Sequence, residues 1–273
     1  MKIPYYECNS NGNTFIILYP FSVSKVLSPK FIQEICKSYG SEKVDGLILI
    51  RNKNKLFSID YYNNDGSWET FCLNGTVCSS KILLENKINI KKIITGSGKC
   101  NVNFLKNNKI KIELNNPYTM KFDKNNLKWR NSHLVFESYL IDHFECFYIY
   151  SGAKHVVIKS RDDILFNDNK LLEKKLKKIR YNKLFLPDGV NVNIYKIINN
   201  NTIQVKTYEK GVESMMKSCS SGSLACAFHH YHNLKSKAIK IINDGGESEI
   251  FFKNNKSEFI SNGNIKYKGE LNI

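Results

Sequence analysis

The sequence predicts an α+β protein with largely antiparallel sheets and few helices. Short segments rich in Ile, Val, Tyr and Phe alternate with turns of Asn, Gly and Lys, which is typical of strands joined by short connections. Few segments show the spacing of a helix. The chain has 273 residues, of which 42% are hydrophobic, so it can build one large core or two smaller ones.

The clearest helix signal lies near the N-terminus. Ser28 and Pro29 suit an N-cap and the first turn, and Ile32 and Ile35 begin a series of apolar residues at helical spacing. Gly40 is suited to end the helix. We therefore expect a helix that begins at Pro29 and ends before Gly40.

Five later segments have the composition of strands. They are residues 56–62, 109–114, 147–150, 155–159 and 203–208. The second of them ends at Asn115, Asn116 and Pro117, where the proline closes the strand. We therefore expect an N-terminal domain over residues 1–116 and a C-terminal domain over residues 117–273, with the last strand free to return to the first domain.

A similar motif recurs in the two halves of the chain. In each half, a strand and a polar loop precede Cys-x-x-Gly and then apolar residues at helical spacing, from Cys72 to Gly75 and from Cys219 to Gly222. Each cysteine is therefore expected at the start of a helix. A helix N-terminus presents unpaired N–H groups and the positive end of the helix dipole. It therefore lowers the pKa of a nearby thiol and favours a bound carboxylate.

Two such helix starts suit a proton-transfer site. If they face each other across a cleft, they hold one carboxylate between them and place a sulfur on either side of the adjoining α-carbon. One sulfur removes the α-proton and the other delivers a proton to the opposite face, which inverts the carbon without a cofactor. The alternative is that Cys72 and Cys219 are small residues that fill helix starts, as free cysteines often do.

Charge and hydropathy exclude other broad classes. The chain carries 41 basic and 25 acidic residues, a formal charge of +16. The surplus is lysine spread among asparagines, without the arginine and aromatic motif of an RNA-binding sheet, so nucleic acid is not an expected partner. No apolar stretch is long enough to cross a membrane, and the N-terminus has no apolar signal region. The expected location is the cytoplasm, where the eight cysteines stay reduced.

A series of short motifs follows along nearly the whole chain. They are Gly12-Asn13-Thr14-Phe15, Asp45-Gly46-Leu47, Asn63-Asn64-Asp65-Gly66-Ser67, Cys72-Leu73-Asn74-Gly75, His155-Val156-Val157, Gly189-Val190-Asn191-Val192, Tyr208-Glu209-Lys210-Gly211 and Cys219-Ser220-Ser221-Gly222. Their order and spacing resemble the diaminopimelate epimerase family, cofactor-independent enzymes that invert one α-carbon with two cysteines. The resemblance implies two similar domains, each with a strongly curved sheet wrapped around a central helix, which close over the ligand.

The resemblance also implies roles for residues in these motifs. Cys72 and Cys219 are the implied acid/base pair, and the turns after them supply N–H donors to the α-carboxylate. The residues implied to bind substrate are Asn13, Asn63, Leu73, Asn74, His155, Asn191, Glu209, Lys210, Ser220 and Ser221. Glu209 suits the α-ammonium group, and His155 matches a histidine close to the catalytic centre. The implied partner is a small-molecule amino-acid substrate, with no metal and no PLP or other cofactor, and a homodimer stays open.

Several positions depart from the family pattern. Leu73 stands where the family usually has Gly, Val77 and Lys210 where it tends to have Arg, Ala153 where it has Asn, and Gly46 where it often has Gln. Lysine does not reproduce the bidentate contact of arginine with a carboxylate, so the grip on the distal end of diaminopimelate is expected to be weaker. Racemisation of another amino acid, for example histidine, is therefore the alternative to diaminopimelate.

Three other interpretations stay open. Leu73 and Val77 also suit a homologue that binds an amino acid without turnover, although a binder needs neither thiol. A phenazine-biosynthesis-type isomerase shares the fold but does not use the cysteine pair. Cys226 and His230 lie four residues apart on the second predicted helix, as metal ligands can, but no fourth ligand is evident.

Overall fold

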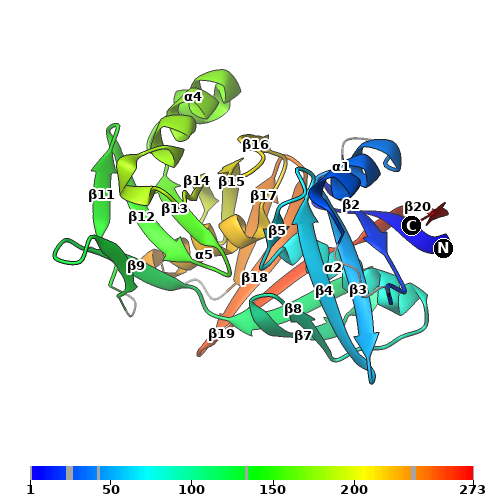
Figure 1. Cartoon of the computed structure of the whole chain (residues 1–273). Coiled ribbons are helices and arrows are strands. Elements are labelled where there is room, and N and C mark those ends of the chain that lie inside the picture. Colours follow the sequence, from blue (N-terminus) through cyan, green and yellow to red (C-terminus); the bar gives the residue numbers. More distant parts are fainter. Residues whose placement is uncertain (1, 23–26, 42–43, 133–134, 235–237, 273) are drawn as a thin grey trace. The chain divides into compact units, whose positions relative to one another are not determined.

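The computed structural model describes residues 2–22, 27–41, 44–132, 135–234 and 238–272, which form two compact units (Figure 1). The first unit, unit 1, is Met1–Leu114 together with Glu258–Ile273. The second, unit 2, is Asn115–Ser257. The range 117–273 expected for the C-terminal domain therefore includes a segment that belongs to the first unit. The reason is that the last strand pairs with the first along nearly its whole length.

The first unit contains a mainly antiparallel sheet. Its strands are β1 Lys2–Ser10, β2 Asn13–Leu18, β3 Gly46–Lys53, β4 Leu56–Asn63, β5 Trp68–Glu69, β6 Lys92–Thr95, β7 Gly98–Phe104, β8 Lys109–Asn115 and β20 Asn264–Asn272. Their order is β20–β1–β2–β3–β4–β6–β7–β8, with β5 beside β4, and only the pairs β2–β3 and β4–β6 among these are parallel. The helices of this unit are α1 Pro29–Ser38, α2 Leu73–Glu85 and the 3-10 turn η1 Lys106–Asn108.

The second unit has a sheet of the same kind. Its strands are β9 Tyr118–Asp123, β10 Lys128–Asn131, β11 Ser138–Ile141, β12 Phe144–Tyr150, β13 Lys154–Lys159, β14 Asn191–Asn199, β15 Thr202–Glu209, β16 Ser214–Met216, β17 Ala238–Asn243 and β18 Gly246–Lys253. The order is β10–β9–β12–β13–β14–β15–β17–β18, with β11 beside β12 and β16 beside β15. Its helices are α3 Asp163–Asn167, α4 Asn169–Arg180, the 3-10 turn η2 Lys183–Phe185 and α5 Ser220–Leu234, and β19 Lys256–Asn262 crosses the boundary between the units.

The two units repeat one order of elements. In the first, β2 leads through α1 into the parallel strand β3, and in the second β13 leads through α3 and α4 into the parallel strand β14. An antiparallel strand, a short strand, a helix that follows a cysteine and another parallel strand come next in both. Parallel neighbours require such crossovers. The recurring Cys-x-x-Gly motif thus occupies the same position in a structural repeat.

The helices α2 and α5 are central in their own units. α2 packs against β1, β2, β3, β4, β6 and β20, and α5 packs against β13, β14, β15, β17 and β18. All residues from Leu73 to Ser80 in α2 and from Ser220 to His230 in α5 are buried. A helix buried on every side needs a sheet that curves around it. The predicted fold class, a mostly antiparallel sheet around a central helix in each unit, is confirmed.

A further helix covers the other face of each sheet. In unit 1, α1 buries Ile32 and Ile35 in one core cluster, and the Ser28 side chain caps its first turn as predicted. In unit 2, α4 packs against β14 and β15 and buries Leu172 and Leu176 in another core cluster. The five segments predicted as strands are confirmed as β4, β8, β12, β13 and β15. In the described ranges, no helix is long and apolar enough to span a membrane.

Candidate active site

Strand alternation decides which side chains face the central helices. In β2, Ile16 belongs to the core cluster around α1, so Asn13, which lies three residues away, points to the α2 side. In β14, Val192 belongs to the cluster around α4, so its neighbours Asn191 and Asn193 point to the α5 side. The predicted polar residues therefore lie on the face of each sheet that carries the cysteine-led helix.

Cys72 is the N-cap residue of α2. Its side chain is the acceptor for the Gly75 N–H, with 3.3 Å between Sγ and N. Gly75 lies close to β3, because a Cβ atom there would lie 2.7 Å from the end of the Ile48 side chain, which would have to move. The glycine of the motif thus lets the helix start approach the sheet closely, and the thiol takes one of the unpaired N–H groups of the first turn.

A buried amide network lies beside this helix start. Asn74 donates a short hydrogen bond from Nδ2 to Oδ1 of Asn13. Asn13 in turn donates to the Asp45 carboxylate at 3.3 Å, and the Thr14 N–H donates to the same oxygen at 3.0 Å. The structure therefore brings the predicted residues Asn13 and Asn74 together next to Cys72. Sequence reasoning missed Asp45, although it directly precedes a glycine in one of the motifs.

Two other predicted residues of unit 1 have local partners. Asn63, at the end of β4, accepts a hydrogen bond from the Tyr61 hydroxyl at 2.9 Å and donates to Ser67 Oγ at 3.0 Å. Leu73, the first residue of α2, has its side chain in the core. A leucine in place of the usual glycine is therefore accommodated inside the unit rather than on its surface.

Gly46 does not leave open space. A Cβ atom at this position would lie 2.5 Å from the carbonyl oxygen of Tyr62 and 2.6 Å from the Tyr61 ring. The cross-strand register places Gly46 opposite Asn63, so the tyrosine two residues before Asn63 reaches across. The Tyr61 ring therefore occupies the place that a longer side chain at position 46 would take.

Cys219 lies directly before α5 and is buried. Burial is the main cause that raises the pKa of its thiol to about 12, and the charge of Glu209 is the second. Hydrogen bonds from the Ser221 side chain and from the backbone of Ser221 and Gly222 act in the opposite direction. The thiol therefore keeps its proton at neutral pH, while the helix start provides groups that can stabilise the thiolate. Ser220 and Ser221 are the first two residues of α5 and both are buried.

His155 is joined to Cys219 through Ser221. Its Nε2 atom lies 3.0 Å from Ser221 Oγ, which lies 3.5 Å from Cys219 Sγ. Complete burial lowers the pKa of His155 to about 3, so the imidazole is neutral near pH 7. The structure brings together these three predicted residues, and Ser151 holds the same turn by donating to the Ser221 carbonyl at 2.7 Å.

Asn191 is hydrogen-bonded to the turn after β15, which carries the predicted substrate-binding residue Lys210. Its Oδ1 accepts the Lys210 N–H at 2.9 Å, and its Nδ2 donates to the Lys154 carbonyl at 3.3 Å. Glu209, the last residue of β15, is close enough to Cys219 to affect its pKa. The predicted site residues of unit 2 therefore form one neighbourhood around the start of α5.

Sequence reasoning missed Asn193. This residue is fully buried between Val192 and Ile194, and its amide contacts the His155 ring, with 3.0 Å between Nδ2 and Nδ1. The sequence signal that could have found it is an asparagine between apolar residues of a strand. Such an amide is expected to be buried, and a buried amide has hydrogen-bond partners. Its importance depends on the parallel register of β13 and β14, which no local pattern reveals.

The histidines of α5 have partners of other kinds. His229 Nδ1 lies 2.8 Å from the Tyr195 hydroxyl, and His230 Nε2 lies 3.0 Å from the Asn200 carbonyl oxygen. Within the part of the chain that the structure describes, no three His, Cys, Asp or Glu side chains are grouped to hold a metal ion. The zinc interpretation of Cys226 and His230 therefore finds no ligand set there.

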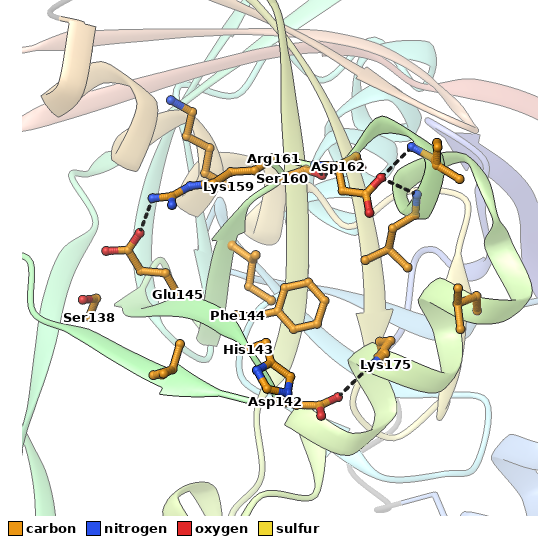
Figure 2. A pocket seen from close by; sticks show the side chains of 15 residues that line it. Ser138, Asp142, His143, Phe144, Glu145, Lys159, Ser160, Arg161, Asp162 and Lys175 are labelled. Atoms are coloured by element: carbon orange, nitrogen blue, oxygen red, sulfur yellow. Dashed lines mark hydrogen bonds and ion pairs between the residues drawn. The ribbon is translucent and has the colours of Figure 1, made fainter.

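A groove of about 770 Å³ lies elsewhere in unit 2 (Figure 2). Leu140 contributes to its wall, and two ion pairs line it, between Asp142 and Lys175 at 3.4 Å and between Glu145 and Arg161 at 3.0 Å. None of the residues predicted for the site lines this groove. The neighbourhood of Cys219 is therefore distinct from it.

Sequence comparison finds relatives over almost the whole chain. A diaminopimelate epimerase from Hydrogenobaculum sp. is 31% identical over 262 residues, which cover 90% of this chain and 89% of the relative. A diaminopimelate epimerase from Campylobacter jejuni subsp. doylei is 30% identical over 278 residues, which cover 98% of each chain. No family-wide sequence profile matches the chain.

Solved structures with the same fold have much lower sequence identity. A phenazine biosynthesis protein of the PhzF family from Enterococcus faecalis superimposes with a TM-score of 0.69 at 12% identity, covering 100% of both chains. A hydroxyproline epimerase from Agrobacterium vitis, with trans-4-hydroxy-L-proline bound, superimposes with a TM-score of 0.68 at 10% identity, covering 99% of this chain and 92% of the other. At these identities the likeness concerns the fold alone.

Proposed function

Since this chain belongs to the diaminopimelate epimerase family, we propose that it is a cofactor-independent amino-acid racemase or epimerase in which Cys72 and Cys219 transfer the protons. Its relatives are amino-acid epimerases, a class of isomerase that acts on small molecules. One observation carries the assignment of the two cysteines. In both units of the structural repeat, the cysteine stands directly before the central helix.

The surroundings of the two thiols support different parts for them in the ligand-free protein. Cys219 is buried and its raised pKa keeps it protonated, so it is assigned the acid. Cys72 is half-buried, and the Gly75 N–H points at its sulfur, a contact that favours the thiolate. Cys72 is therefore assigned the base for the first direction of turnover.

The proposed reaction needs two proton transfers. The Cys72 thiolate takes the α-hydrogen as a proton, and the electron pair of the broken C–H bond stays on the substrate, shared between the α-carbon and its carboxylate. Cys219 then delivers its proton to the opposite face and becomes the thiolate, so the reverse reaction can start from the product. The N–H groups at the starts of α2 and α5 are assigned to the α-carboxylate, whose growing charge they stabilise.

The remaining contacts are assigned by chemistry and position. Glu209 carries the charge that suits an α-ammonium group. The buried amides of Asn13 and Asn63 and the part-buried amide of Asn191 offer both donors and acceptors. His155 is neutral at pH 7, so its proposed part is hydrogen bonding rather than proton abstraction. Cytoplasmic location and the homodimer stay predictions.

The substrate proposed first is diaminopimelate, after the relatives. A different amino acid is the second candidate, favoured by Lys210 and Ala153, which replace the arginine and asparagine expected for a distal amino-acid head. Gly46 no longer supports this second candidate, because the Tyr61 ring fills the space beside it.

Incubation with LL-diaminopimelate and a panel of L-amino acids in deuterated water tests the proposal. We expect one of them to acquire deuterium at the α-carbon together with inversion, measured by mass spectrometry and chiral chromatography. Cys72→Ala and Cys219→Ala proteins serve as controls for the catalyst. Saturable binding of an amino acid without exchange would instead support a non-catalytic homologue and contradict the proposed function.

A further inference from the structure

A chain of hydrogen bonds leads through unit 2 to Cys219. Thr207 Oγ1 lies 2.9 Å from Asn193 Oδ1, and Asn193 Nδ2 lies 3.0 Å from His155 Nδ1. His155 Nε2 lies 3.0 Å from Ser221 Oγ, which lies 3.5 Å from Cys219 Sγ. All five residues are buried. The direction in which each proton points is therefore decided by the protein's own groups.

The Asn193 amide has one favourable orientation. Its Nδ2 atom lies 3.1 Å from the carbonyl oxygen of Val156, which can only accept a hydrogen bond. Turning the amide over would place two oxygens against each other, whereas the present orientation lets Thr207 donate to Oδ1. Nδ2 therefore donates to His155 Nδ1, and this ring nitrogen is the acceptor.

The orientation of Asn193 then decides the rest of the chain. A neutral imidazole has one N–H, and because Nδ1 accepts, the hydrogen is on Nε2. Nε2–H donates to Ser221 Oγ, which leaves the serine's own hydrogen to point at Cys219 Sγ. A donor in this position stabilises a thiolate more than a thiol.

We propose that Asn193 is a positioning residue, which selects the Nε2–H tautomer of His155 and so directs the Ser221 hydroxyl hydrogen at Cys219 Sγ. The value of this device for turnover rests on the proposed function, in which Cys219 gives up and regains a proton. Gly222 lies against the same amide, because a Cβ atom there would lie 2.0 Å from Asn193 Oδ1. The first turn of α5 is thus packed directly on the amide that orients the histidine.

The tautomer can be measured without any activity. In protein labelled with ¹⁵N-histidine, NMR identifies which ring nitrogen of His155 carries the hydrogen, and His155→Gln assigns the signal. We expect Nε2–H in the wild type and in Thr207→Val, where the Val156 carbonyl still orients the amide. In Asn193→Asp, a carboxylate faces the ring and has no hydrogen to donate, so Nδ1 acquires one. Nδ1–H in the folded wild type overturns the proposal.

The effect on the thiol is measured separately. Iodoacetamide alkylation of Cys219, followed by peptide mass mapping at a fixed pH below the thiol pKa, reports the thiolate fraction. We expect Ser221→Ala and Asn193→Leu to slow it about tenfold, the size of one hydrogen bond to a charged group, and Thr207→Val to change it less than threefold. An unchanged rate in folded Asn193→Leu, judged by circular dichroism, contradicts the proposal.

These readouts separate the inference from the proposed function. If the tautomer and the alkylation rates are as expected but no amino acid exchanges its α-hydrogen, the hydrogen-bond device stands and the racemase assignment fails. If the wild type exchanges the α-hydrogen but His155 carries its hydrogen on Nδ1, the racemase assignment stands and Asn193 does not have the proposed role.

Discussion

The guanidinium group of Arg180 lies 2.9 Å from the carboxylate of Glu213 and ties the end of α4 to the turn that follows β15. Glu213 also accepts the Gly211 N–H at 3.1 Å and has a left-handed backbone with φ +53°. Glu209 and Lys210 stand at the start of this turn. An ion pair outside the predicted site therefore holds the segment that carries two proposed ligands.

Replacing Glu213 should weaken both the fold and substrate binding. Glu213→Ala leaves the buried Arg180 side chain without its counter-charge, so we expect a loss of about 2 kcal/mol in the free energy of unfolding. The cost is below that of a fully buried pair because Glu213 is about a third exposed. KM should rise more than kcat falls. Glu145→Ala, which breaks the exposed pair with Arg161, is the control and should change neither the free energy of unfolding nor the kinetic constants. Equal effects of the two substitutions would contradict the role of the Arg180 pair.

Removing either proposed catalytic thiol should abolish inversion while leaving the protein folded. Cys72→Ala and Cys219→Ala each remove one of two groups that act on opposite faces of the carbon. Cys72→Ser and Cys219→Ser should also be badly impaired, because a hydroxyl is a far weaker base than a thiolate. Racemisation is measured by chiral chromatography on the true substrate. Cys146→Ala, in the core cluster beside α4, is the control for loss of a buried cysteine and should stay active. Activity within tenfold of the wild type in either catalytic variant would disprove the two-cysteine mechanism.

Acid should destabilise the protein through buried neutral histidines. Burial lowers the pKa of His155 to about 3 and that of His229 to about 4, whereas the unfolded chain binds these protons near pH 6.5. Their contribution is therefore complete above about pH 6.5 and is lost as the pH falls towards 4, by roughly 1.4 kcal/mol per pH unit for each histidine. Urea titrations at several pH values measure this slope. His229→Phe should reduce the slope of the free energy of unfolding against pH by the amount that corresponds to one proton. An unchanged slope would show that His229 is not buried as a neutral group.

Substrate choice should not strongly favour diaminopimelate. Lys210 offers one ammonium group, whereas an arginine would hold a carboxylate with two parallel hydrogen bonds. A pocket of this kind therefore discriminates weakly between amino acids. We expect at least one amino acid without a second amino-acid head to have kcat/KM no lower than that of LL-diaminopimelate. Histidine, lysine, glutamate and aromatic amino acids form the panel, and Lys210→Arg should shift preference towards diaminopimelate. A thousandfold preference of the wild type for diaminopimelate would mean that Lys210 serves as the distal anchor.

Local signals in the sequence were sufficient for several elements and for the cysteines. The cap at Ser28 and the apolar spacing of α1 are contained in one short segment, and so are the β-branched strands. The repeated Cys-x-x-Gly motif also predicted the starts of α2 and α5, because a helix start has its own residue preferences. The pairing of β20 with β1 brings the two ends of the chain together, and no local pattern encodes it.

The residues missed at the site depend on cross-strand register. Tyr61 fills the space beside Gly46 because β3 and β4 pair with Gly46 opposite Asn63. Asn193 reaches His155 because β13 and β14 run parallel and both present these side chains to α5. Motif spacing identifies residues near each other in the chain, whereas these contacts join strands whose alignment is fixed only when the sheet forms.

The return of the C-terminal strand makes the second unit an insertion within the first. Asn115–Ser257 is continuous, so a chain emerging from the ribosome can complete this unit as soon as Ser257 is available. The sheet of Met1–Leu114 lacks its β20 edge until the final strand has been synthesised, and β1 meanwhile presents an unpaired edge. Residues 1–114 are thus made before the second unit, but their sheet is completed after it.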